Sequence, residues 1–571
     1  MLYIKLSVER ATRSQPVLLL VIIAAFFPIA NRGAYKGYFG DDEFDNLALT
    51  RAIGPSDAIA GLLSSRYYEN NFRPVGHLFY RALGAAAGLN YPPYIAALHL
   101  LHFVNIALLW LILRRLQLPF WASAAALVFF ALHMAVFDIY WRPMYVYDLL
   151  CGTFCLLALL FWLGDRWILS LVSFWMAYRS KEIAVMLPIA LAAYDLMLSK
   201  RRWLRLAPFF SISIWFGLQG LFVATHLKSA YSMHYQPADL AKSILFYSSR
   251  VFLTPPVAAL VLLLVPVLIT LLTRDRLIWF GLIAFAALLT PMLLLSERLS
   301  GAYLYVPLIG LTIAIGAVAA RPRAALAVAA ALLLWIPWDY VNLRRQRREA
   351  LSQVDDRRAY IATLSDLVHS QPQLTSFLYL DGPFLESGAL GAIRWLRPGV
   401  DIMLAREDGP DRTKILEQPE MAVLYWNRTA HRLEPAVRAP ATADAAFIDI
   451  GSRLPVWQLG DGWFPAEGAY RWTRPHATAR LLRPANATEF ELTVNIGQQY
   501  LDRIHRSHVD VAFNGQKVGV ADFDRLGYQT VRWKLGAAPA GPTEVAFDTS
   551  PPYPGADPLG SAICSFGFLP R

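Results

Sequence analysis

Charged residues are scarce in this sequence. Of its 571 residues, only 17% are charged, whereas 56% are hydrophobic and the mean hydropathy is +0.38. A soluble domain usually carries about 25% charged residues, so the deficit argues against a soluble globular protein. Cysteines are also few. Cys151, Cys155 and Cys564 form no disulfide framework and lack the spacing of a zinc site.

The hydrophobic residues form long runs rather than amphipathic stripes. Several runs approach the roughly 20 residues that a helix needs to cross the hydrocarbon core of a bilayer. Short basic clusters between the runs account for the net charge of +11, so we predict no nucleic-acid partner. The nearly uncharged runs are 95–113, 120–137, 183–198, 209–224, 257–272, 277–295 and 325–337.

The basic clusters also predict the topology. They lie within 5–13, 114–115, 200–205, 274–276 and 321–323 and mark cytoplasmic helix ends. We therefore expect a polytopic α-helical protein of the bacterial inner (plasma) membrane, in contact with membrane lipids. It would have roughly eleven spans, a cytoplasmic N-terminus and a periplasmic C-terminal part. The short run 17–30 also fits the apolar region of a signal peptide.

Three domains are expected. Residues 1–341 form a transmembrane core with an outer loop at 31–94, and 342–444 form a small α/β segment with strands near 377–380, 401–404 and 421–425. Residues 445–571 read as a β-sandwich, in which Asn514-Gly515 suits the tight turn of a hairpin. The arginine-rich stretch 344–348 conflicts with the positive-inside rule, although such stretches also bind phosphate head groups.

The segment Gly40-Asp41-Asp42-Glu43-Phe44-Asp45 carries four carboxylates directly after the first apolar run. Carboxylates beside a membrane are costly unless they are solvated or functional. A carboxylate can take the proton from an attacking hydroxyl in glycosyl transfer. A solvated acidic loop explains this motif alone equally well.

Further motifs follow in a fixed order, and the ordered set resembles the GT-C superfamily of membrane glycosyltransferases over roughly 35–320. The resemblance is greatest to the branch of the protein O-mannosyltransferases of the transmembrane-and-tetratricopeptide type, although no tetratricopeptide repeats are found. The tail is similar instead to carbohydrate-binding sandwich domains. The motifs are Asn71-Phe72-Arg73-Pro74, Tyr140-Trp141-Arg142-Pro143, Tyr147-Asp148, Ser180-Lys181-Glu182, Ser296-Glu297-Arg298 and Tyr303-Leu304-Tyr305, with Gly462–Glu467 and Asp557–Gly560 in the tail.

The resemblance implies a polyprenyl-phosphate-linked sugar as donor and an Asp in the first outer loop as catalytic base, paired with a second acidic residue. The match falls on Asp41-Asp42 or on Asp42-Glu43. Asp42 is favoured because it belongs to both alignments, and Asp41 is the second candidate.

The remaining candidates concern the donor and the substrate. Cations at the outer helix ends would stabilise the leaving phosphate, although interfacial anchors occur at the same places. His99 and His102 fit a helix–helix hydrogen bond better than a metal site. The acidic cluster offers oxygen ligands, so the sequence leaves open whether a divalent cation binds there. No other cofactor is expected. The candidates are Arg73, Arg142, Lys181 and Arg298 for the phosphate, and Tyr147, Asp148, Glu182 and Tyr303 for the substrate.

These expectations combine into one function, an inverting transfer of a hexose or pentose from a polyprenyl-phosphate donor to an acceptor on the outer face. The acceptor, whether protein, glycolipid or polysaccharide, is not indicated. The alternatives are a glycolipid transporter or flippase and an oligosaccharide ligase, each with a sugar-binding tail. A transporter usually shows internal repeats with broken helices, and no repeat is evident here.

Overall fold

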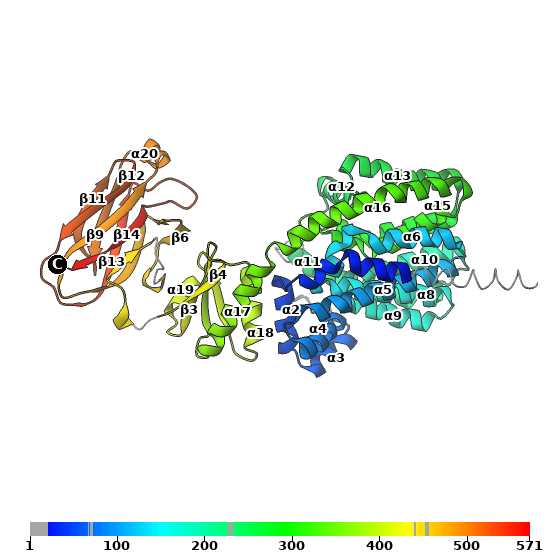
Figure 1. Cartoon of the computed structure of the whole chain (residues 1–571), viewed down its shortest axis with the longest axis horizontal. Coiled ribbons are helices and arrows are strands. Elements are labelled where there is room, and N and C mark those ends of the chain that lie inside the picture. Colours follow the sequence, from blue (N-terminus) through cyan, green and yellow to red (C-terminus); the bar gives the residue numbers. More distant parts are fainter. Residues whose placement is uncertain are drawn as a thin grey trace, which may run out of the picture. The chain divides into compact units, whose positions relative to one another are not determined.

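The computed structural model describes residues 21–66, 68, 72–226, 232–438, 441–450 and 456–570. The chain divides into two compact units, Met1–Asp355 and Asp356–Arg571 (Figure 1). The first unit ends later than the domain boundary expected after residue 341, because the helix that carries the last apolar run continues to Leu351. The basic cluster at 5–13, the start of the first apolar run at 17–20 and Asn71 lie outside the described residues.

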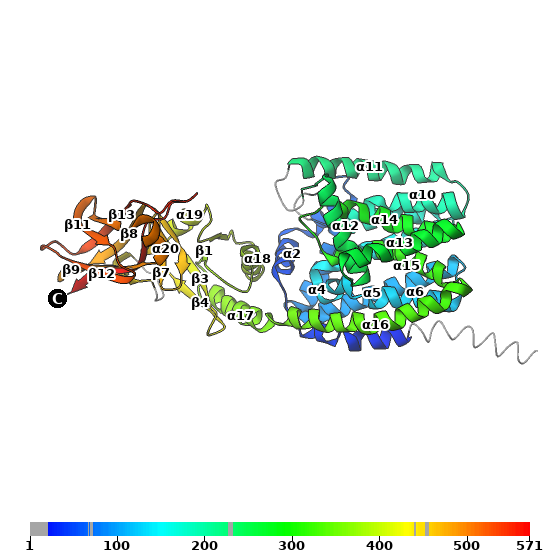
Figure 2. The ribbon, with the colours of Figure 1, turned by 90° about the horizontal axis from the view of Figure 1, so that it is seen from above.

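The first unit is helical, and Figure 2 shows α11 and α16 at its opposite edges. A helix over Val21–Ala30 comes first. It is followed by α2 (Asp41–Ala52), α3 (Pro55–Leu63), α4 (Pro74–Ala87), α5 (Tyr91–Arg115), α6 (Phe120–Leu132), α7 (Phe137–Trp141), α8 (Val146–Leu163), α9 (Trp167–Ser180), α10 (Leu187–Leu198), α11 (Trp203–His226), α12 (Pro237–Phe252), α13 (Pro256–Thr273), α14 (Arg276–Leu293), α15 (Pro307–Ala319) and α16 (Pro322–Leu351).

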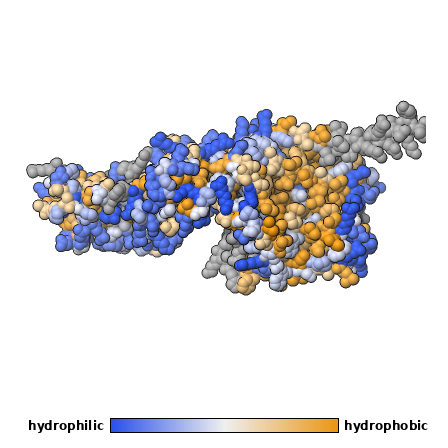
Figure 3. Space-filling model, turned by 90° about the horizontal axis from the view of Figure 1, so that it is seen from below, coloured by the Kyte–Doolittle hydropathy of each residue, from blue (hydrophilic) through white to orange (hydrophobic). Residues whose placement is uncertain are grey.

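Six helical segments of the described residues are long and apolar enough to cross a membrane, or seven if the bent pair of α12 and α13 counts as one span. Figure 3 shows the corresponding apolar band on one face of the unit, bordered by polar residues. The unit is therefore a multi-pass membrane unit, whereas the predicted count of eleven spans is not confirmed. The six segments are Tyr91–Arg115, Phe120–Trp141, Pro143–Leu163, Trp203–Val223, Arg276–Leu293 and Pro322–Ser370, and the shorter apolar helices are Val21–Ala30 and α15.

Short 3-10 turns interrupt the helices where the candidate residues lie. The turn η3 (Pro143–Tyr145) leads into α8, η4 (Glu182–Met186) into α10 and η5 (Gly301–Leu304) into α15. Proline within or just after these turns disfavours continuous helix across them, because it lacks the backbone N–H and clashes with the preceding turn. Irregular backbone at membrane depth is tolerated where it lines a water-filled cavity, and all three turns contribute to one cavity.

Two glycines allow α14 and α15 to pack backbone against backbone. A Cβ on Gly281 would lie 2.6 Å from the Ala314 nitrogen, and one on Gly310 would lie 2.4 Å from the Phe285 nitrogen. Small residues permit this close approach of membrane helices. The contact fixes the start of α15, and thereby η5, next to the cavity.

The second unit begins with an α/β segment. Helix α17 (Val354–Ser370) precedes a four-stranded sheet of order β2-β1-β3-β4, in which β1 is parallel to β2 and β3 and only β4 is antiparallel. The predicted strands are confirmed to within a few residues. The elements are β1 (Ser376–Tyr379), α18 (Glu386–Leu396), β2 (Met403–Arg406), α19 (Arg412–Glu417), β3 (Met421–Asn427) and β4 (Arg432–Val437).

Two further sheets form the C-terminal sandwich, with orders β11-β10-β13-β8 and β12-β9-β14-β7-β6, and β5 pairs with β14. The predicted hairpin is confirmed as β10 and β11, and Asn514 and Gly515 both have positive φ, as a tight turn of this kind requires. The elements are β5 (Phe447–Asp449), β6 (Trp463–Glu467), β7 (Tyr470–Thr473), β8 (His476–Arg483), β9 (Ala487–Ile496), α20 (Gln498–Ile504), β10 (Ser507–Phe513), β11 (Gln516–Phe523), β12 (Gly527–Lys534), β13 (Gly541–Ser550) and β14 (Ala562–Pro570).

Candidate active site

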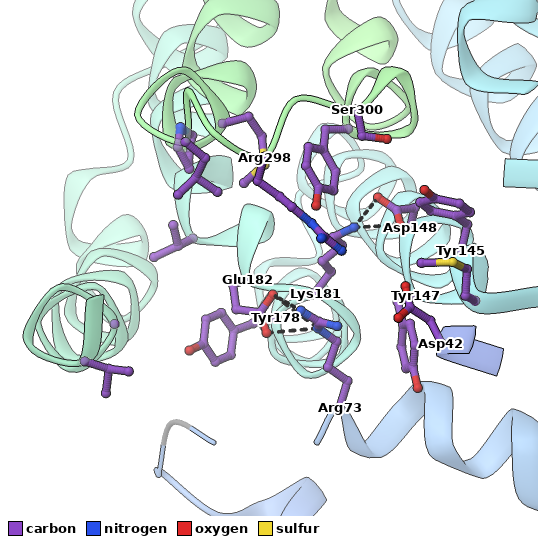
Figure 4. A pocket seen from close by; sticks show the side chains of 18 of the residues that line it. Asp42, Arg73, Tyr145, Tyr147, Asp148, Tyr178, Lys181, Glu182, Arg298 and Ser300 are labelled. Carbon is purple, nitrogen blue, oxygen red and sulfur yellow. Dashed lines mark hydrogen bonds and ion pairs between the residues drawn. The ribbon is translucent and has the colours of Figure 1, made fainter. Parts of the chain in front are cut away.

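A cavity of about 990 Å³ collects most of the candidate residues from distant parts of the sequence. Its polar side is formed by α2, the start of α4, η3 with α8, the end of α9 with η4, and η5 (Figure 4). Its apolar side is formed by α11 and the end of α14. Eight of the eleven residues predicted from the sequence line it: Asp42, Arg73, Tyr147, Asp148, Lys181, Glu182, Arg298 and Tyr303.

Asp42 is the member of the acidic cluster that reaches the cavity together with Asp45. It lies in the first turn of α2, which begins after Gly40. The positive end of the helix dipole favours a carboxylate at this position. One turn further along α2, Asn46 donates to the Asp42 carbonyl at 2.6 Å and accepts from the Tyr147 hydroxyl at 2.6 Å. This contact joins α2 to α8 beside the candidate base.

Glu43 has a different environment. Only 1% of it is exposed, its carboxylate accepts from the Gly40 backbone N–H at 2.9 Å, and it lies 3.7 Å from the Arg142 guanidinium. Neither Glu43 nor Arg142 lines the cavity, and Asp41 does not line it either. The structure therefore separates these three candidates from the other eight: α2 turns Asp41 and Glu43 to sides other than that of Asp42, and Arg142 pairs with Glu43.

Arg73 and Glu182 form a bidentate ion pair, with N–O distances of 3.0, 3.2 and 3.1 Å. The guanidinium also lies 5.3 Å from the centre of the Tyr147 ring. Burial is the largest single influence on Glu182 and raises its pKa, but the charge and hydrogen bonds of Arg73, together with a backbone hydrogen bond and the charge of Lys181, hold the pKa of this carboxyl below its usual value. The pair joins the start of α4 to η4 across the cavity wall.

Lys181 and Asp148 form the second ion pair. The ammonium lies 2.7 Å from both carboxylate oxygens, and only 2% of the Asp148 side chain is exposed. The ammonium also lies 4.5 Å from the centre of the Tyr303 ring. Lys181 is thereby held between α8 and η5, with its charge on the cavity side, as Figure 4 shows.

The lining also includes polar residues that sequence reasoning did not select. A search for charged motifs does not select Asn46, because its side chain is uncharged, although it lies one helical turn after Asp42. Tyr178 and Phe216 stack with ring centres 4.0 Å apart and meet only in the folded chain. Together the lining contains five carboxylates and three cations: Asp42, Asp45, Asp148, Glu182 and Glu297 against Arg73, Lys181 and Arg298.

The histidines of α5 serve helix packing, as predicted. His99 contacts the Tyr140 carbonyl of α7 at 3.2 Å, and His102 contacts the Ala131 carbonyl of α6 at 3.2 Å. Among the described residues, no group of three or more His, Cys, Asp or Glu side chains is placed to hold a metal ion.

No protein-family model and no curated protein sequence matches this chain. Two solved structures are similar to it at low identity. ArnT from Cupriavidus metallidurans, bound to undecaprenyl phosphate, shows 17% identity and a TM-score of 0.45, covering 75% of this chain and 99% of that one. The arabinofuranosyltransferase AftD from mycobacteria shows 12% identity and a TM-score of 0.36, covering 96% of this chain and 60% of that one.

Proposed function

We propose that this protein is a GT-C-type membrane glycosyltransferase that moves a sugar from a polyprenyl-phosphate donor to an acceptor hydroxyl on the outer face of the membrane. The observation that carries the proposal is that Asp42 lines one cavity together with Arg73, Lys181 and Arg298. This arrangement provides a base and a set of cations between apolar helices.

In the proposed reaction, Asp42 takes the proton of the acceptor hydroxyl while its oxygen forms a bond to the anomeric carbon. The bond between that carbon and the phosphate oxygen breaks, and the polyprenyl phosphate leaves with the electron pair. Attack from the opposite side inverts the anomeric centre. The three cations stabilise the charge that develops on the leaving phosphate.

The ion pairs also suit this role. Glu182 and Asp148 compensate the charges of Arg73 and Lys181 when no donor is bound. A guanidinium has five N–H donors, so Arg73 can donate to an arriving phosphate while it still donates to its carboxylate partner. We infer that Tyr147 and Tyr303 contact the sugar, because each ring lies beside one of these cations.

The test is transfer of radiolabelled sugar from a panel of polyprenyl-phosphate donors in membranes that contain the full-length protein. Asp42→Asn is expected to lower transfer by about 10²–10⁴-fold, the usual contribution of a general base. Asp41→Asn is the matched control, because it makes the same charge change one residue away and outside the lining. An EDTA arm reports whether a divalent cation takes part.

Equal transfer by wild type and Asp42→Asn would refute the assignment of the base. If wild type transfers no sugar from any donor but moves a labelled glycolipid between leaflets, the transport alternative replaces the enzyme. The same proposal places the site on the outer face of the membrane and the second unit in the periplasm. It also assigns sugar binding to the sandwich of that unit.

A further inference from the structure

Helix α16 carries an apolar face that the rest of the unit leaves uncovered. Leu326, Leu334 and Val341 are 80%, 78% and 57% exposed. Successive helical residues are about 100° apart, so these three side chains lie within one stripe. The most apolar stretch of the segment that begins at Pro322 is only 6% buried. In a multi-pass membrane unit, such a stripe faces lipid tails.

The same stripe continues into arginines. Arg344 and Arg348 follow Val341 within two turns on the same face, Arg345 flanks them, and all three are exposed. Two exposed aromatic residues, Trp338 and Tyr340, lie one to two turns before the arginines. Aromatic rings favour the membrane–water interface, so the three guanidinium groups are placed at the level of the lipid head groups.

A second segment adds positive charge next to the arginines of α16. A Cβ on Gly33 would lie 2.6 Å from Arg347 Nε, which means that Arg347 packs directly over the turn η1 (Arg32–Lys36). Arg32 and Lys36 of this turn are exposed. We define the α16 basic patch as Arg32, Lys36, Arg344, Arg345 and Arg348.

We propose that the α16 basic patch binds the phosphate of an anionic phospholipid whose acyl chains lie along the apolar stripe of α16. The guanidinium group matches a phosphate with two parallel N–H donors. The apolar stripe that precedes the arginines on α16 faces lipid and can contact the acyl chains. A soluble anion would leave this stripe without a partner. This site is separate from the cavity, since none of its residues lines it, and the inference does not depend on the proposed function.

The test uses the full-length protein in nanodiscs made of equal parts phosphatidylcholine and phosphatidylglycerol, followed by native mass spectrometry of the retained lipid. Wild type is expected to retain phosphatidylglycerol preferentially. Each arginine at a membrane surface strengthens attraction to anionic lipid about fivefold. The variant Arg344→Gln/Arg345→Gln/Arg348→Gln is therefore expected to lose the preference by on the order of 100-fold at low salt. Replacement of the same residues by Lys should keep most of it.

The control removes three exposed arginines from the second unit, as Arg503→Gln/Arg506→Gln/Arg525→Gln. It has the same net charge as the α16 variant and is expected to retain lipid as wild type does. An equal loss in the control, or equal lipid ratios in wild type and the α16 variant, overturns the proposal. Binding of soluble glycerol phosphate that depends on the same arginines, without any preference among nanodisc lipids, would assign the patch to a free anion instead and also overturns it.

Discussion

Replacement of Lys181 by Met tests whether the cations of the cavity are held by their carboxylate partners. The change keeps an unbranched side chain but leaves the Asp148 carboxylate, 2% exposed, without its partner at 2.7 Å. Breaking a buried ion pair on one side costs about 3–5 kcal/mol. Unfolding entropy is about 2.1 cal/mol/K per residue, and the first unit ends at Asp355. The expected fall in its melting temperature is therefore roughly 4–7 °C.

The assay is thermal unfolding of the purified full-length protein in detergent, with sugar transfer measured on the same samples. The double variant Lys181→Met/Asp148→Asn removes both charges, so most of the lost stability should return. Transfer should stay low in both variants, because the donor phosphate loses a cation. If the single variant has the melting temperature of wild type, or if the double variant melts no higher than the single variant, the ion pair does not stabilise this part of the cavity.

Three further predictions follow from single contacts. Glu43→Gln should lower thermal stability, because the buried negative charge that faces Arg142 at 3.7 Å is lost. Transfer per folded molecule should stay near wild type in a comparison of activity with folded fraction. Gly310→Leu should abolish a stable first unit, since there is no space for a side chain, and a monodisperse peak in size-exclusion chromatography would contradict this. The pKa of Glu182 is held below its usual value, so its ion pair with Arg73 is intact above the usual carboxyl pKa and is lost only as pH falls through the lowered pKa. Donor affinity measured from pH 7 to 5 should therefore stay flat.

Sequence patterns singled out the acidic segment at the start of α2 but left open which of its carboxylates is the candidate base. The motif contains adjacent carboxylates, and no pattern in the sequence tells which of them faces a cavity. Helix α2 decides this, because Asp42 and Glu43 point about 100° apart. Glu43 is consequently buried against Gly40 and Arg142, and Asp42 lines the cavity.

The predicted number of membrane spans is not confirmed. Hydropathy predicts roughly eleven crossings, whereas length and apolar composition identify six or seven among the described residues. Helices α9, α10 and α15 have only 14, 12 and 13 residues and are therefore shorter than a full span, because the turns that carry Glu182 and Tyr303 lie at their ends.

Local chemistry in the sequence determined what each segment is. Long uncharged runs must be membrane helices because lipid cannot solvate the backbone of any open alternative, and Asn514-Gly515 must turn because both residues adopt positive φ readily. Only the tertiary structure decided which side chains meet. The pairs Arg73 with Glu182 and Lys181 with Asp148 join residues far apart in the sequence. Such contacts depend on the crossing of helices, which follows from packing over the whole unit and leaves no local signature.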